Sequence, residues 1–494
     1  MSSDIFHDEV NLWLLFPAHA PRVLFHTPAF ALGFLPIALI AFFLCGRYGG
    51  HRAAMLCLVL FSLTFYGWWN PIHVPLLLGS LAANLFFARR IAARPSSRAW
   101  LTGGIAFNLL LLGWFKYADF AAQTVAPDSP RLNIALPLAI SFFTFQQIMF
   151  LTDSRTGRIS GLNPLSYVAC ITFFPHIVAG PIVRPAEIMP QFAAADLTRP
   201  NRANLTEGLS LFLLGLAKKL VLADLFGRFA DTGFDAAEQN AALTFFEAWY
   251  ATLAYALQIY FDFSGYSDMA IGLALMFNIR FPLNFLSPYQ ARDIGDFWRR
   301  WHITLGQFLR DHVYIPLGGN RAGPARYRLN LVLTMLIGGL WHGAAWKFVL
   351  WGGIHGVLLA LLPLGRSRLF VLLAVVLSWV PFRADSLPAA WAMARGLLGL
   401  NGIALPTMIL DAVPTLGLLV DRTPVLPYLG DARTLSFPEV TVCLLLGWTI
   451  VLFAPQVHAL SLRARRWAIA AGFALTVQAM FFAPRVAPFL YFQF

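Results

Sequence analysis

The chain has 494 residues, of which 58% are hydrophobic and only 12% are charged, whereas soluble proteins carry about 25% charged residues. This composition excludes most soluble globular folds. Lys and Arg number 36 against 24 Asp and Glu, which leaves a net charge of +12. Because charge is so scarce and no polar linker divides the chain, the composition favours one polytopic membrane domain with a basic cytoplasmic face, not a nucleic-acid-binding protein.

The N-terminal residues 1–23 differ from a cleavable signal peptide, because Asp4, Asp8 and Glu9 precede the first Lys or Arg. Their apolar run, from Val10 to Phe16, is too short to cross a bilayer. We therefore predict that residues 1–23 form an interfacial extension and that residues 24–494 form a single membrane domain.

Apolar segments recur along the rest of the chain, and roughly eleven of them are expected to cross a hydrocarbon core about 30 Å thick. Gly and Pro interrupt several others, which predicts re-entrant or interfacial helices. The candidate segments are 29–46, 53–69, 74–88, 99–115, 134–151, 166–183, 208–225, 241–260, 264–279, 329–341, 344–362, 369–382, 440–453 and 467–482. The predicted fold class is therefore an all-α polytopic membrane protein.

Arginines are distributed unevenly between the connecting segments. They follow the first, third and fifth apolar segments, whereas the alternate connections, 70–73 and 117–133, are nearly free of basic residues. Since cytoplasmic loops carry the excess of Lys and Arg, odd-numbered spans are expected to end in the cytoplasm. The cluster Arg463, Arg465 and Arg466 precedes the last segment. Both termini are accordingly predicted to lie outside the cytoplasm.

Polar residues are concentrated between Gln258 and Gly356, which we take as the central catalytic region. It opens with Asp262 and Asp268, placed between two apolar segments. An unpaired carboxylate near the bilayer centre costs about 2.5 to 3.5 kcal/mol on insertion scales. Two interpretations are open: the carboxylates face protein or water inside the membrane, or they belong to a polar turn at its surface.

An amphipathic helix is predicted next, beginning near Asp293 and ending before a Pro-Leu-Gly-Gly turn. On one such helix, Trp298 and His302 share an apolar stripe. Arg299 and Arg310 share another face, about 16 Å apart along the axis. These arginines either hold phosphates of a nucleotide-bearing donor or reach lipid headgroups. His302 is either a hydrogen-bonded core residue or a catalytic group.

A second histidine, His342, lies in one of the most apolar stretches, between Gly339 and Gly343. An ionisable side chain at such depth is a functional candidate by default, and the alternative is a histidine hydrogen-bonded to a neighbouring helix. His355 would not share a face with it on a continuous helix and is interpreted as structural. No metal-binding spacing such as H-E-x-x-H occurs, so we predict histidine acid–base chemistry without a metal.

Four motifs fall in this region. They are Tyr260-Phe-Asp-Phe-Ser-Gly-Tyr-Ser-Asp-Met-Ala-Ile-Gly272, Phe297-Trp-Arg-Arg-Trp-His302, Tyr314-Ile-Pro-Leu-Gly-Gly-Asn-Arg321 and Gly338-Gly-Leu-Trp-His-Gly343. In these motifs the chain resembles the membrane-bound O-acyltransferase (MBOAT) family, and most of all its bacterial branch of alginate O-acetyltransferases. The D-alanyl transferase of teichoic acid is a more distant resemblance. Weaker matches, such as Lys218-Lys219, extend the resemblance from about residue 24 to the end.

The resemblance implies a ring of membrane helices around a thinned centre that is crossed by a tunnel. The family's invariant histidine corresponds to His342 and its second histidine to His302, so both are expected to be catalytic. Roles in lining or supporting the tunnel are expected for Asp262, Asp268, Trp298, Trp341 and Asn320. Contacts to the phosphates of acetyl-CoA are expected for Arg299, Arg300 and Arg310.

The resemblance further implies that acetyl groups pass from cytoplasmic acetyl-CoA across the bacterial inner membrane to an alginate-like periplasmic exopolysaccharide. Acetyl-CoA is then a substrate, and no permanently bound cofactor is expected. The acetyl group reaches the polymer directly or through a periplasmic SGNH-type acetyltransferase, and the other partners are membrane lipids and exopolysaccharide machinery. Imidazole titrates near neutral pH, so His342 is the expected general base, while His302 orients the acceptor or thioester.

Two other functions stay open. One is transfer of another acyl group to a different cell-envelope polymer, for which tunnel width near Trp341 and Trp346 is decisive. The other is transport of a polysaccharide or lipid, with Asp262, Asp268 and His342 as relay groups. Only the acyltransferases consume an acyl donor, and this separates the two classes.

Overall fold

The computed structural model describes residues 24–494 except 160, 322, 362–366, 414, 417–419, 424–425, 429–436, 457–466, 468, 471, 475, 478–488 and 491–494. The α-helices of this part are α1 Leu35–Trp69, α2 Val74–Ala93, α3 Ala99–Leu112, α4 Ala118–Val125, α5 Ile140–Arg155, α6 Pro164–Thr172, α7 Phe174–Ile177, α8 Pro185–Phe192, α9 Arg202–Ala217, α10 Asp224–Glu238, α11 Phe245–Met276, α12 Ile294–Arg300, α13 Ile303–Leu309, α14 Pro324–His342, α15 Trp346–Leu361, α16 Arg368–Arg383, α17 Leu387–Leu397, α18 Thr407–Ala412 and α19 Phe437–Phe453. The π-helical segments are η2 Ala29–Phe34, η4 Gly113–Tyr117, η5 Lys218–Ala223 and η7 Arg310–Tyr314, and the 3₁₀ segments are η3 Pro71–His73 and η6 Pro288–Gln290. Strands β1 Ala404–Pro406 and β2 Asp421–Thr423 pair in parallel.

Three helical stretches of the described chain are long and apolar enough to cross a membrane: Ala29–Trp69, Pro71–Ala93 and Ala99–Val125. Shorter apolar helices are Trp346–Leu361 and Phe437–Phe453. The predicted all-α membrane fold is confirmed, whereas the number of spans, roughly eleven, stays a prediction. The predicted extension 1–23, the basic cluster 463–466 and half of segment 467–482 lie outside the described residues.

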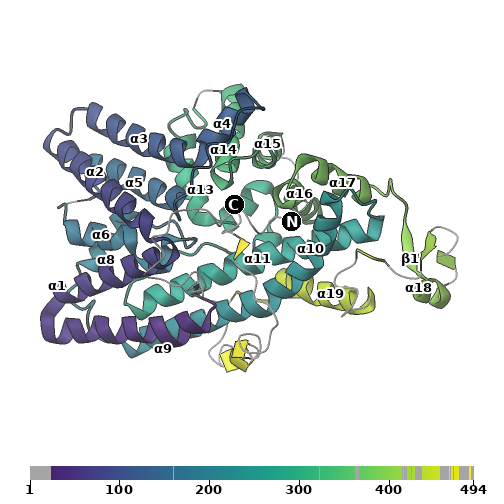
Figure 1. Ribbon diagram of the computed structural model, residues 1–494, viewed down its shortest axis with the longest axis horizontal. Coiled ribbons are helices and arrows are strands. Elements are labelled where there is room, and N and C mark those ends of the chain that lie inside the picture. Colours follow the sequence, from purple (N-terminus) through teal and green to yellow (C-terminus); the bar gives the residue numbers. More distant parts are fainter. Residues whose placement is uncertain are drawn as a thin grey trace.

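The long helix α11 lies between the two halves of the molecule. Figure 1 shows α1, α2, α3 and α5 gathered on one side and α14 to α17 on the other, with α11 crossing between them. The buried hydrophobic side chains of the described residues form two clusters, and α11 contributes to both. Its residues 248–263 belong to the cluster shared with α16 and α17, and its residues 266–276 belong to the cluster shared with α1 and α5.

Helix α11 is continuous where two separate segments, 241–260 and 264–279, are predicted. Its carboxylates are paired with lysines of η5: Lys219 Nζ lies 2.7 Å from Asp262 Oδ1, and Lys218 Nζ lies 2.6 Å from Asp268 Oδ2. Because both charges are compensated inside the protein, the helix passes through them without a break. The interpretation of this segment as a polar turn is therefore wrong.

The predicted segment 166–183 is divided into the short helices α6 and α7, and α8 follows it. Pro164 and Pro185 occupy the first helical positions of α6 and α8. Proline has no N–H and its ring clashes with the preceding turn, so it starts a helix readily and does not continue one. This part of the chain consequently has no helix of membrane-spanning length.

Glycines allow α9 and α11 to touch backbone to backbone. A Cβ at Gly272 would collide with the Gly208 carbonyl oxygen and lie 2.8 Å from the Phe212 nitrogen. A Cβ at Gly265 would lie 2.8 Å from the Gly215 carbonyl oxygen. The two glycines on each helix are two turns apart, so both contacts fall on one face. This close approach brings the η5 lysines within reach of the α11 carboxylates.

Replacing Gly272 with Ala is expected to force α9 and α11 apart and to lower stability by about 1 to 3 kcal/mol, as overpacking does in other cores. The measurement is thermal unfolding of the detergent-solubilised protein. Gly79→Ala is the matched control, because a Cβ at Gly79 meets no atom within 4 Å. Equal melting temperatures for the two variants would contradict the proposed contact between the helices.

Candidate functional site

His342 is the last residue of α14, and it is 7% exposed. The helix ends there because Gly343 adopts an extended conformation, with φ −167° and ψ 151°. A Cβ on Gly343 would overlap the ring of Phe348 in α15, so a glycine is required at this position by packing. The sharp connection from α14 to α15 therefore places the His342 imidazole at a helix end.

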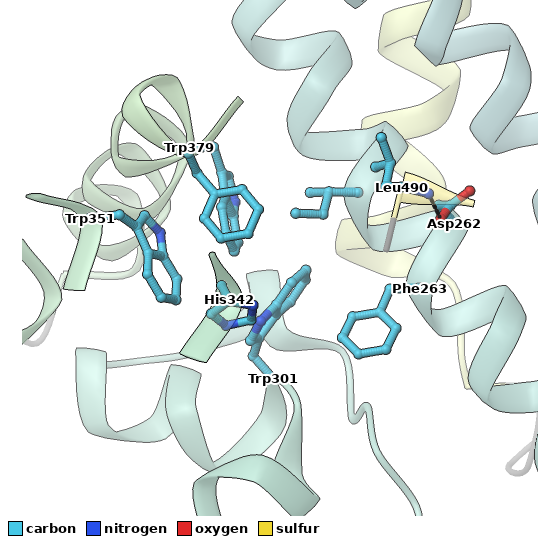
Figure 2. Close-up of a pocket in the computed structure, with 9 residues that line it drawn as sticks. Asp262, Phe263, Trp301, His342, Trp351, Trp379 and Leu490 are labelled. Atoms are coloured by element: carbon cyan, nitrogen blue, oxygen red, sulfur yellow. Dashed lines mark hydrogen bonds between the residues drawn. The ribbon is translucent and has the colours of Figure 1, made fainter. Parts of the chain in front are cut away.

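Aromatic rings surround the His342 side chain. Its ring centroid lies 5.1 Å from that of Trp351 and 5.3 Å from that of Phe382, both in edge-on geometry. His342 also lines a small cavity. Figure 2 shows His342 beside Trp301, Trp351 and Trp379, with Asp262 and Leu490 across this cavity. The lining residues are Ile259, Asp262, Phe263, Trp301, His342, Trp351, Trp379, Phe382 and Leu490. The cavity has room for about one water molecule.

His302 reaches the same region through a break in the predicted amphipathic helix. Trp301 is extended, and His302 has φ 43° and ψ 53°, a left-handed conformation that costs a non-glycine residue about 1 to 3 kcal/mol. The prediction of one continuous helix is thus wrong. The Ile303 N–H donates to the Asn284 carbonyl oxygen at 3.0 Å, so the preceding segment compensates for the break.

Asn284 also orients the His302 ring. His302 Nδ1 lies 3.1 Å from Asn284 Oδ1, and the same oxygen accepts from the Thr304 N–H at 3.3 Å. Because a backbone N–H can only donate, the facing atom of Asn284 is its oxygen, and His302 Nδ1 must be the donor. In the neutral ring, Nε2 then carries the lone pair that acid–base chemistry needs.

The structure brings the two predicted catalytic histidines together from segments 40 residues apart in sequence. Their ring centroids are separated by 6.4 Å. Trp341 lies close to both, with its ring centroid 5.0 Å from that of His342 and 5.9 Å from that of His302. Of the two histidines, only His342 lines the cavity.

Asp262 is the one carboxylate among the residues that line the described cavity. Its Oδ1 is paired with Lys219, which also lies 2.8 Å from Asp224 Oδ1. Its Oδ2 accepts the Leu490 N–H at 3.0 Å, the contact drawn in Figure 2. Asp268, the other predicted supporting carboxylate, does not line the cavity. Asp262 thus meets the cavity with its charge already compensated.

Trp298 lies outside the cavity wall and takes part in hydrogen bonds that support it. Its Nε1–H donates to His355 Nδ1 at 3.3 Å, and His355 Nε2 lies 2.9 Å from Ser378 Oγ. Ser378 in turn donates to the Val375 carbonyl oxygen at 2.6 Å. Both nitrogens of His355 are therefore engaged in a hydrogen-bonded chain that holds α12, α15 and α16 together, which agrees with a structural role.

The predicted phosphate-binding arginines lie near carboxylates of their own segments. Arg299 is 68% exposed and lies 3.7 Å from Asp296, Arg300 lies 3.0 Å from the same residue, and Arg310 is 60% exposed and lies 2.7 Å from Asp311. The break after Arg300 means that Arg299 and Arg310 do not share a face of one helix, and that prediction is wrong. Their role in binding acetyl-CoA stays a prediction.

Two of the remaining predicted residues lie outside the cavity. Asn320 is exposed on the turn after η7, and its neighbour Gly319 accepts a hydrogen bond from Asn330. Trp346, expected to bear on the tunnel width, is half exposed, and its ring is tilted against that of Phe120 with the centroids 5.5 Å apart. The tryptophans that line the described cavity are Trp301, Trp351 and Trp379.

Sequence reasoning missed Asn284, Trp351, Phe382 and Lys116. Lys116 donates to the carbonyl oxygen of Trp341, directly before His342. A signal for Lys116 was present, because a lysine inside the apolar stretch Ala99–Val125 is a functional candidate by its depth alone. The others are ordinary residues whose importance comes only from their placement.

A helical membrane protein with one buried histidine on an aromatic cavity, and a second buried histidine close to the first, is equipped for acid–base transfer chemistry. Residues 106–364 match the family model described as MBOAT, the membrane-bound O-acyltransferase family. The chain belongs to this family, and it is a multi-pass membrane acyltransferase of the O-acetyltransferase group.

Curated relatives agree with this assignment. The chain is 42% identical to a peptidoglycan O-acetyltransferase of Helicobacter pylori over 430 residues, which cover 78% of this chain and 81% of the relative. It is 38% identical to a probable alginate O-acetylase of Pseudomonas aeruginosa over 399 residues, covering 76% and 75%. A teichoic acid D-alanyltransferase of Bacillus subtilis is 25% identical over 342 residues, covering 66% and 84%.

Replacing Asn284 with Leu is expected to lower acyl transfer about tenfold or more, because His302 loses the acceptor that fixes its ring and tautomer. The measurement is acyl transfer per amount of folded protein in membranes. Asn330→Leu is the matched control: Asn330 is also buried and donates to a backbone carbonyl, that of Gly319, away from the cavity. Equal losses in both variants would contradict an orienting role for Asn284.

Proposed function

We propose that this protein transfers acetyl groups from cytoplasmic acetyl-CoA to a polysaccharide outside the bacterial inner membrane. The observation that carries the proposal is that His342 lines a small, mostly aromatic cavity and that its ring centroid lies 6.4 Å from that of His302. An acetyl group is the smallest acyl group that a common thioester donor supplies. The names of the relatives, a peptidoglycan O-acetyltransferase and a probable alginate O-acetylase, support acetyl transfer to a glycan.

In the proposed step, His342 accepts the proton of an acceptor hydroxyl while that oxygen attacks the thioester carbonyl carbon. A C–O bond forms, the C–S bond breaks, and the thiolate of coenzyme A receives the proton to leave as the thiol. His302, oriented by Asn284, positions the acceptor or the thioester. Positioned acid–base groups of this kind contribute about 10² to 10⁴ in rate.

Contacts within the structure support the proposed orientation in the membrane. Arg155 donates to the Ser97 carbonyl oxygen at 2.7 Å, so the arginine-rich ends of the third and fifth predicted segments lie together. Tyr66 donates to the Leu138 carbonyl oxygen at 3.0 Å, which joins the arginine-poor end of α1 to the stretch before α5. With the arginine-rich side in the cytoplasm, both termini lie in the periplasm.

The donor's phosphates are proposed to contact Arg299, Arg300 and Arg310, whose guanidinium groups suit bidentate phosphate binding. The acceptor is proposed to be a hydroxyl of an alginate-like exopolysaccharide or of another cell-envelope glycan. The acetyl group reaches it directly or through a periplasmic SGNH-type acetyltransferase associated with the polysaccharide machinery. Acetate released separately from the exopolysaccharide and from peptidoglycan distinguishes these two acceptors.

His342→Ala is expected to abolish most polymer acetylation, by about 100-fold or more, because the acceptor loses its base. The measurement is base-released acetate from the exopolysaccharide and, separately, from purified peptidoglycan of cells that express each variant. His51→Ala, on α1 and outside the cavity, is the control. Unchanged acetate on both polymers, with the His342 variant inserted at wild-type levels, would refute the proposal.

Phe382→Ala is expected to widen the acyl preference. One methylene in a fitted apolar pocket is worth about 1 to 3 kcal/mol, or 10- to 200-fold in discrimination. Wild-type protein should therefore strongly prefer acetyl-CoA to propionyl-CoA. In the variant, the ratio of the initial rate with acetyl-CoA to that with propionyl-CoA should be about tenfold lower. The ratio is measured as initial rates of thiol release in inverted membrane vesicles. A wild-type protein that uses both donors equally would contradict acetyl specificity.

A further inference from the structure

We infer that Lys116 and Tyr117 are positioning residues that hold the end of α14 and thereby set the place of His342. The inference rests on the proposed function only in taking His342 as the catalytic base. Neither residue belongs to the cavity wall. Both act on backbone atoms of the residues around His342.

The contacts fall on the last carbonyl groups of α14. Lys116 Nζ donates to the Trp341 carbonyl oxygen at 2.5 Å and lies 3.5 Å from the His342 carbonyl oxygen. Tyr117 Oη donates to the Leu340 carbonyl oxygen at 2.7 Å. The last four carbonyls of an α-helix have no partner within the helix. Two adjacent residues from another helical stretch thus satisfy three of these four groups.

Lys116 also ties a third element to this point. Its Nζ lies 3.1 Å from Ser141 Oγ at the start of α5, and it lies 6.0 Å from the ring centroid of Trp341. The indole N–H of Trp341 donates to the Ser141 carbonyl oxygen at 3.4 Å. The ammonium group therefore joins η4, α5 and α14 directly beside the histidine.

Electrostatics favour a lysine at this place. The C-terminal end of a helix carries a partial negative charge, so a cation there is stabilising. A lysine within a membrane span is unfavourable on insertion scales, and such residues are typically functional. Lys116 and Tyr117 lie in η4, a π-helical segment, and π-bulges are frequent at functional sites.

The glycines around His342 explain why the end of α14 needs hydrogen bonds from outside the helix. Gly338, Gly339 and Gly343 flank the histidine and have no side chains with which to fix this part of the backbone. Positions 339 and 343 must be glycine, because a Cβ at either one would collide with Phe348. The end of α14 therefore gains its lateral hydrogen bonds from Lys116 and Tyr117.

The first experiment compares full-length variants in inverted membrane vesicles, with acetyl-CoA as donor and thiol release as the readout. Lys116→Met is expected to lower kcat about 10- to 100-fold, since a displacement of about 1 Å can cost 100-fold. The KM for acetyl-CoA should change less than about twofold, because the donor-binding groups are untouched. Tyr117→Phe should give a smaller loss of kcat in the same pattern, and Lys116→Arg, which keeps the cation and donors, should recover most of the activity.

Arg155→Met is the matched control. Arg155 is also a basic residue that donates to a distant backbone carbonyl, that of Ser97, but it lies at the other end of α5. Fifteen residues along that helix correspond to about 22 Å. Its kcat should stay within about twofold of wild type. Equal losses of kcat in Lys116→Met and Arg155→Met would overturn the inference.

A second measurement does not depend on activity. Hydrogen–deuterium exchange of the peptide covering residues 336–345 should become faster in Lys116→Met than in wild type or Arg155→Met. Unchanged exchange there would overturn the inference even if activity were lost. Absence of acetyl-CoA turnover in the wild-type protein would instead contradict the proposed function, and the exchange result would still decide whether Lys116 holds the end of α14.

Discussion

Pairing of the η5 lysines with the α11 carboxylates is the interaction on which the rest of the structure depends. In an apolar interior a lone charge costs several kcal/mol, so Asp262 and Asp268 can lie within α11 only if Lys219 and Lys218 reach them. That reach in turn requires the backbone contact between α9 and α11. Since α11 belongs to both hydrophobic clusters, fixing it fixes the two halves of the molecule against each other.

Basic side chains also lie in other π-helical segments of the described chain. Lys116 lies in η4, Lys218 and Lys219 lie in η5, and Arg310 begins η7. Each of these segments is π-helical, with hydrogen bonds spanning one residue more than in an α-helix. The buried lysines among them bind either carboxylates of a neighbouring helix or the carbonyl end of another helix. The few charges of the interior thus serve as connections between helices.

Much of the fold could be predicted from the sequence, because it depends on local signals, whereas the catalytic role of the two histidines stays a prediction. Long apolar runs identify a membrane protein, and four motifs led to His302 and His342. The continuity of α11 could not be predicted, because the lysine that compensates Asp262 lies 43 residues away in sequence. The left-handed turn at His302 depends likewise on Asn284, 18 residues earlier. Periodicity in a single segment contains no information on such partners.

Because of such long-range contacts, polar and charged groups near the cavity already have partners within the protein. Trp298, His355 and Ser378 satisfy one another behind the wall, and the charge of Asp262 is compensated by Lys219. The wall that remains is mostly aromatic, and His342 is the one imidazole among the residues that line it. Under the proposed function, selectivity for acyl transfer over hydrolysis depends on how far the aromatic wall keeps further water from the acyl group, as well as on this histidine.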